Sequence, residues 1–160
     1  MSPIDVIRVD QPSPRSAPFV VMPDQHEPLN VVGEQITVLA SGAQTGSYEL
    51  FRQLGPEGSG PPPHTHPWDE SFYVISGEVT FGINGREAVA VPGTLVHFPA
   101  GTVHGFRFGK GGSEMLSITS REGASHLFAD VDREVSPDDP DLARLIEVSG
   151  WHGLEVFPPN

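Results

Sequence analysis

Cysteine is absent from this 160-residue chain, which excludes disulfide bonds and any metal site built on thiolate ligands. Basic residues are few: nine Lys and Arg stand against 21 Asp and Glu, and a formal net charge of −12 repels nucleic-acid phosphates and anionic membranes. The first twenty residues lack the basic start and apolar run of a secretory signal, and no stretch has the apolar length of a membrane helix. We therefore expect a soluble, cytoplasmic protein that binds neither nucleic acid nor membrane.

Glycine and proline are abundant by contrast, with 18 and 17 residues, and they separate short apolar runs. Such punctuation is typical of an all-β sandwich or barrel, and the short spacing leaves no room for crossover helices, so we expect antiparallel pairing. Asn84-Gly85 predicts a type I′ hairpin turn. The predicted strands are Gln35–Ala40, Ser47–Leu54, Ser71–Ile75, Glu78–Ile83, Arg86–Val91, Thr94–Phe98, His104–Phe108 and Glu114–Thr119.

The two ends of the chain differ from this β-rich middle. Residues 1–33 are rich in proline and are predicted to form an arm, with a strand at Phe19–Met22, that covers the barrel or contacts a second subunit. Residues 34–120 form the predicted barrel. Residues 121–160 form a C-terminal extension whose apolar period is close to 3.6, which favours short helices packed outside the barrel.

Two helices are expected in this extension. The first spans Ser125–Val131. The second spans Pro140–Ser149, with Asp139 as its N-cap and Gly150 at its C′ position. Its inward-facing residues are predicted to be Leu142, Leu145 and Ile146.

Four side chains in the predicted barrel have spacings that allow them to meet at one metal ion. His64 and His66 share one face of an extended segment, Glu70 keeps the same parity, and His104 follows the turn at Pro99-Ala-Gly101. Imidazole nitrogen and carboxylate oxygen suit Fe, Mn, Co, Ni, Cu or Zn. We expect one divalent transition metal with coordination positions left open, as in a catalytic site. The alternatives are histidines that bind no metal and a filled, purely structural metal site.

The residues around these ligands resemble the two sequence motifs of the cupin superfamily. Its first motif, G-x5-H-x-H-x3–4-E-x6-G, is met by Gly58, His64, His66, Glu70 and Gly77. Its second motif, G-x5-P-x-G-x2-H-x3-N, is met by Gly93, Pro99, Gly101 and His104, with Phe108 in place of the final Asn. The resemblance implies a double-stranded β-helix, or jelly-roll barrel, and a homodimer. The C-terminal pattern looks like that of small proteins grouped with quercetin 2,3-dioxygenase.

A quercetinase-like dioxygenase is the function that this resemblance favours. Glu70 would act both as a metal ligand and as the general base. Strand parity predicts that Phe72, Val74 and Phe106 line an apolar pocket for a small enolisable or phenolic substrate. The alternatives are a metal-dependent lyase, isomerase or cyclase of secondary metabolism, and a non-enzymatic cupin that binds a small molecule. The sequence leaves the roles of Arg52, Trp68 and His97 open.

Overall fold

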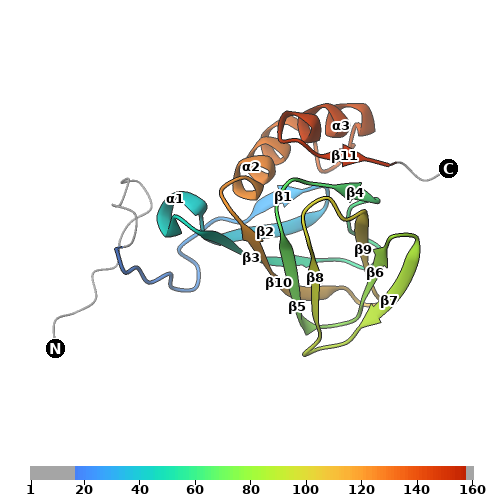
Figure 1. The fold of residues 1–160 in the computed structure, drawn as a ribbon, viewed down its shortest axis with the longest axis horizontal. Coiled ribbons are helices and arrows are strands. Elements are labelled where there is room, and N and C mark those ends of the chain that lie inside the picture. The colour runs from blue at the N-terminus through green and yellow to red at the C-terminus, as the bar shows by residue number, and fades with distance from the viewer. Residues whose placement is uncertain (1–16, 158–160) are drawn as a thin grey trace.

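The computed structural model describes residues 17–157, in which two antiparallel β-sheets pack face to face as a jelly-roll barrel (Figure 1). The first sheet has the strand order β1-β2-β3-β10-β5-β8 and the second has the order β11-β4-β9-β6-β7. The strands are β1 Leu29–Val31, β2 Glu34–Ala40, β3 Tyr48–Gly55, β4 His64–Thr65, β5 Glu70–Ser76, β6 Val79–Ile83, β7 Arg86–Ala90, β8 Leu95–Phe98, β9 His104–Phe108, β10 Ser113–Ser120 and β11 Glu155–Val156.

The eight strands expected from the sequence are all present, with their ends within one residue of the predictions. At the hairpin between β6 and β7, Asn84 and Gly85 have φ values of 49° and 79°, as a type I′ turn requires. The sequence did not indicate β1, β4 or β11. These strands have two or three residues each, too few to show an alternating pattern.

Aromatic side chains join the two sheets in the barrel core. On β5, Phe72 and Val74 point inward and are fully buried, whereas Tyr73 and Ile75 are more than 40% exposed on the outer face. Phe72 packs against Phe81 of the second sheet, with ring centroids 5.3 Å apart. The cluster comprises Phe72, Val74, Val79, Phe81, Ala90, Phe98, Phe106, Phe108 and Met115. Such side chains stabilise a fold by roughly 1.5–3 kcal/mol each when fully buried.

In the part of the chain that the structure describes, three helices lie outside the barrel: α1 Gly42–Thr45, α2 Ala124–Glu134 and α3 Leu142–Trp151. The buried carboxylate of Glu49 on β3 accepts hydrogen bonds from the backbone N–H groups of Gly42, Gly123 and Ser125, at 2.9, 3.1 and 3.0 Å. The bonds from Gly123 and Ser125 satisfy amides at the start of α2, where the N-cap residue is a glycine with no side chain, and the bond from Gly42 holds the start of α1. Glu49 thus ties the helical layer to the barrel, and α2 and α3 pack together over one end of it (Figure 1).

The helix α3 differs from its predicted form. It begins at Leu142, because the carboxylate of Asp141, and not that of Asp139, accepts hydrogen bonds from two amides of the first turn. Leu142 and Ile146 are 50% and 37% exposed. The inner face carries Leu145, Val148 and Ser149, which follow the i, i+3, i+4 spacing of one helical face. The residue with positive φ after the helix is Gly153 and not Gly150, because α3 runs on to Trp151.

The N-terminal arm is described only from residue 17, and residues 1–16 lie outside the described residues. The predicted strand at Phe19–Met22 is wrong, since this segment forms no β-ladder. Pro18 and Pro23 on either side of it provide no backbone N–H for one. Leu29–Val31 pairs with β2 instead. Within residues 17–157, no helix has both the length and the apolar character needed to cross a bilayer.

Candidate metal centre

His64 and His66 are positioned by the loop of residues 58–63, which lies against β9. The Gly58 N–H donates to the Phe108 carbonyl at 2.9 Å, and the Phe108 N–H donates to Ser59 at 2.8 Å. Gly60 has a φ of 140°, and a Cβ atom there would lie 2.0 Å from the Phe106 carbonyl oxygen. Only glycine allows this approach. The loop then continues into β4, where His64 pairs with His104 at the start of β9.

Glu70 and His104 reach the same place from other strands. Glu70 is the first residue of β5 and lies between its ladder partners Phe98 and Thr119. His104 follows the turn at residues 99–101, which is joined to the histidine segment by a 3.0 Å hydrogen bond from the Gly101 N–H to the His66 carbonyl. The structure therefore brings together all four residues that the motif spacing singled out.

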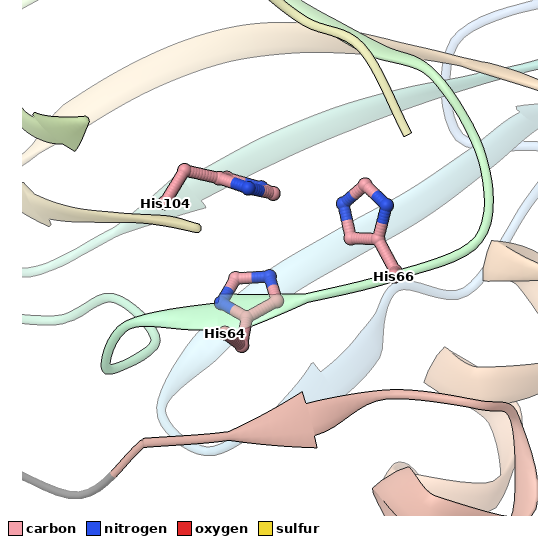
Figure 2. A group of neighbouring side chains, drawn as sticks. All are labelled: His64, His66 and His104. Atoms are coloured by element: carbon pink, nitrogen blue, oxygen red, sulfur yellow. The ribbon is translucent and has the colours of Figure 1, made fainter. Parts of the chain in front are cut away.

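The three imidazole rings converge on one point (Figure 2). Each offers a nitrogen, and these nitrogens lie within 4.8 Å of one another. Glu70 Oε2 is 2.9 Å from His66 Nε2 and 3.2 Å from His104 Nε2. All four residues are at most 8% exposed. Phe98 stacks on His104 at 4.3 Å and Trp68 stacks on His66 at 4.7 Å between centroids, which restricts both rings.

Hydrogen bonds at Nδ1 determine which ring nitrogen faces the centre. His64, His66 and His104 have Nδ1 within 2.8–2.9 Å of the carbonyl oxygens of Pro62, Trp68 and Thr102, respectively. A carbonyl oxygen can only accept, so each Nδ1 carries the proton, and in a neutral ring Nε2 presents a lone pair. Metal-binding histidines are commonly oriented by a hydrogen bond of this kind.

This arrangement of donors fits a cation. Nε2 lone pairs and a carboxylate oxygen repel one another unless positive charge, from protons or from a metal ion, lies between them. Burial, with a smaller contribution from His104, lowers the pKa of His64 to about 4, so this ring is neutral at pH 7. Burial alone would raise the pKa of Glu70, but hydrogen bonds from Nε2 of His104 and His66, which require that Nε2 also carries a proton, lower it to about 2. Three nitrogens and one anionic oxygen are a donor set for a divalent transition metal.

A mainly apolar cavity of about 130 Å³ adjoins these residues. Its walls come from the inner face of the first sheet, from the loop before β4, and from α2 and α3, so the C-terminal extension contributes to the cavity. Phe72 and Phe106 line it, as predicted. Val74 does not line it, because it lies deeper in the barrel core and is fully buried there.

Other polar residues are now placed relative to the cavity. Trp68 lines it. His97 is exposed, with its Nδ1 2.8 Å from Ser71 Oγ, and Arg52 forms a 2.6 Å ion pair with Glu114 while its side chain is 46% exposed. Neither His97 nor Arg52 is among the cavity-lining residues.

The sequence interpretation missed Glu34 and Gln53, which line the cavity. A signal was available for both. Glu34 has the same strand parity as buried Ile36, and Gln53 has the same parity as buried Phe51.

Comparisons with known proteins agree with this fold. Residues 51–119 match the family model of the cupin domain. The chain is 29% identical over 100 residues to quercetin 2,3-dioxygenase of Bacillus subtilis, a match that covers 61% of this chain but only 30% of that enzyme.

Solved structures show the same architecture. KdgF from a Halomonas species has a TM-score of 0.61 and 21% identity over 66% of this chain and 96% of its own. The polyketide cyclase RemF from Streptomyces resistomycificus has a TM-score of 0.52 and 24% identity over 60% of this chain and 70% of its own. A predicted oxalate decarboxylase from Thermotoga maritima has a TM-score of 0.57 and 23% identity over 64% of this chain and 99% of its own. The family match over residues 51–119 and the shared architecture support a cupin domain in this chain.

Proposed function

We propose that this chain is a metal-dependent dioxygenase, similar to quercetinase, that acts on a small enolisable or phenolic substrate. The observation that carries the proposal is the cluster of three histidines and Glu70, of which His64, His66 and Glu70 line an apolar cavity. The similarity to a quercetin 2,3-dioxygenase supports it, although that match spans less than a third of the enzyme's length.

The Nε2 atoms of His64, His66 and His104, together with the Glu70 carboxylate, would hold the metal. When bound, a divalent transition metal supplies Lewis acidity and, where it is redox-active, electron transfer with dioxygen. Glu70 is ionised at neutral pH because its pKa is lowered to about 2. An ionised carboxylate of such low pKa is a weak base, so it would accept the proton of the substrate hydroxyl only where the Lewis acidity of the metal made that hydroxyl acidic; the electron pair would then stay on the substrate oxygen. Phe72 and Phe106 pack against the substrate body and exclude water.

Oxygen uptake by metal-loaded protein tests the proposal. The substrates are a panel of hydroxypyranones, β-diketones, catechols and flavonols, with anaerobic reactions in parallel. Glu70→Gln should lower turnover by about a hundredfold or more, because it removes the base. Glu87→Gln is the matched control, since Glu87 has a side chain 70% exposed on β7 and should leave turnover unchanged. If no compound in the panel causes oxygen uptake by protein loaded with Fe, Mn, Co, Ni, Cu or Zn, the dioxygenase proposal is wrong.

A lyase, isomerase or cyclase that needs no oxygen is the second candidate. The same imidazole and carboxylate donors suit zinc, which has no redox chemistry. Equal substrate turnover in anaerobic and aerobic reactions, with zinc as effective as iron or manganese, would favour this candidate.

A further inference from the structure

The cavity beside the histidines contains polar atoms that have no protein partner. In residues 17–157, buried side-chain atoms without a hydrogen bond include Glu34 Oε2, Gln53 Oε1 and Trp68 Nε1. All three residues line this cavity, and they are only 5%, 3% and 6% exposed. A buried polar group without a partner destabilises the folded protein, so such groups are expected where a ligand supplies the missing bond.

Glu34 and Gln53 occupy one wall of the cavity. Ile36 on β2 is the ladder partner of Gln53 on β3, and Glu34 lies two residues before Ile36 on the same face. Glu34 and Gln53 are therefore diagonal neighbours, roughly 7–8 Å apart by the usual geometry of such pairs. Gly55, also on β3, leaves room for the glutamate, because a Cβ atom there would lie 3.2 Å from Glu34 Cγ.

The chemistry of this wall suits a neutral polar group. Gln53 Oε1 requires a hydrogen-bond donor. Burial, and to a smaller extent the charge of Glu70, raises the pKa of Glu34 to about 8, so at pH 7 its carboxyl is mainly protonated and both donates and accepts. No Lys or Arg side chain of the described residues lines the cavity to pair with an anion there. A hydroxyl group, which donates to Gln53 Oε1 and can accept from Glu34, meets these requirements, whereas a carboxylate or phosphate does not.

The volume of the cavity limits the size of the ligand. An engineered apolar cavity of about 150 Å³ binds one benzene molecule. The present cavity, at about 130 Å³, therefore corresponds to one six-membered ring with small substituents. A three-ring flavonol exceeds this volume and would have to extend through the open side of the cavity.

We propose that Glu34 and Gln53 form a polar subsite that binds a neutral hydroxyl group of a single-ring enolisable or phenolic substrate. The group lies elsewhere on the ring than the oxygen that faces the histidines. The subsite selects both for this second polar group and for a single ring. The inference rests on the proposed function in that the ligand is taken to be the substrate of the histidine centre.

Binding of two single-ring hydroxypyranones tests the subsite without turnover. Kojic acid and allomaltol differ by one hydroxyl group, and zinc-loaded protein allows their affinities to be measured by calorimetry at pH 7 because zinc cannot oxidise them. The wild-type protein should bind kojic acid about tenfold more tightly than allomaltol, the size of effect expected for a buried hydrogen bond. It should bind flavonol at least tenfold less tightly than kojic acid.

Variants assign this preference to the two side chains. Gln53→Leu and Glu34→Leu should lower the kojic acid preference to near unity, while Glu34→Gln should retain it because the amide still forms hydrogen bonds. Gln35→Leu is the matched control, since Gln35 is the exposed neighbour on β2. Circular dichroism and zinc content show whether each variant folds. If a leucine variant does not fold, the ratio of kojic acid to allomaltol affinity in the wild type and in Glu34→Gln still tests the subsite.

Three results would overturn the inference: equal affinity of the wild type for the two pyranones, a preference that persists in Gln53→Leu, or flavonol binding as tight as that of kojic acid. Oxygen uptake separates this inference from the proposed function. A preference for kojic acid without oxygen uptake on any substrate would support the subsite and exclude the dioxygenase function. Oxygen uptake without that preference would support the dioxygenase function and exclude the subsite.

Discussion

Replacing Glu34 with Gln should change how the stability of the protein depends on pH. The pKa of Glu34 rises from its ordinary 4.5 to about 8 in the folded protein, and burial is the main cause. Between these values the unfolded chain ionises while the folded protein keeps the proton. The contribution of this group to the free energy of unfolding is therefore fully present below pH 4.5 and is lost as the pH rises through 8.

The magnitude follows from the same two values. One pKa unit corresponds to about 1.4 kcal/mol, so the rise from 4.5 to about 8 is worth roughly 5 kcal/mol in total, of which roughly 3 kcal/mol falls between pH 5 and pH 8. Glu34→Gln cannot ionise. The variant should gain roughly 3 kcal/mol relative to wild type over this range.

Urea unfolding of metal-free protein at pH 5, 6, 7 and 8, followed by tryptophan fluorescence, measures this difference. Ionisable groups common to both proteins contribute equally, so their contributions cancel when the variant is compared with wild type. The control Glu87→Gln should differ from wild type by a constant amount, because the Glu87 side chain is 70% exposed. If the curves of Glu34→Gln and wild type run parallel from pH 5 to pH 8, Glu34 is not a neutral buried acid in the folded protein.

Three further predictions concern the fold. Gly60→Ala should lower the free energy of unfolding by more than about 2 kcal/mol, because its Cβ would meet the Phe106 carbonyl. Gly58→Ala, where nothing lies near the added Cβ, should lower the free energy of unfolding by less, and urea midpoints measure both changes. Glu49→Gln should cost roughly 2–4 kcal/mol and reduce helical circular dichroism, because an amide cannot accept all the bonds that hold α2; unchanged midpoints would contradict this. The homodimer expected from the sequence would be supported if Leu95→Lys, on the exposed outer face of β8, gives monomers in sedimentation, and weakened if wild type is monomeric.

Strand alternation made most of the barrel predictable from the sequence. On β5 and β9 the side chains alternate between core and surface, and glycines, prolines and Asn84-Gly85 mark where strands end. Motif spacing also identified the four residues that converge at the centre, because a two-residue period places His64 and His66 together and the turn at residues 99–101 returns the chain to them.

Other features depend on tertiary contacts that local patterns do not encode. The strands β4 and β11 exist because they pair with each other and, for β4, with β9. The helix α3 buries Val148 and Ser149 because α2 and the barrel lie on that side, while apolar Ile146 remains exposed. The cavity is lined by residues of the barrel and by residues of α2 and α3, so its volume and its polar groups without hydrogen bonds could be identified only from the folded structure.

Cobalt binding shows whether His64, His66, His104 and Glu70 hold one divalent transition metal. Metal-stripped protein is titrated with cobalt(II) by calorimetry, alongside His104→Ala and the control His97→Ala, whose imidazole is exposed on β8. We predict one cobalt ion per chain in wild type and in His97→Ala, and binding weakened at least a hundredfold in His104→Ala, because a ligand is lost. Failure of the wild-type protein to bind cobalt, or equal affinity in His104→Ala, would contradict the account.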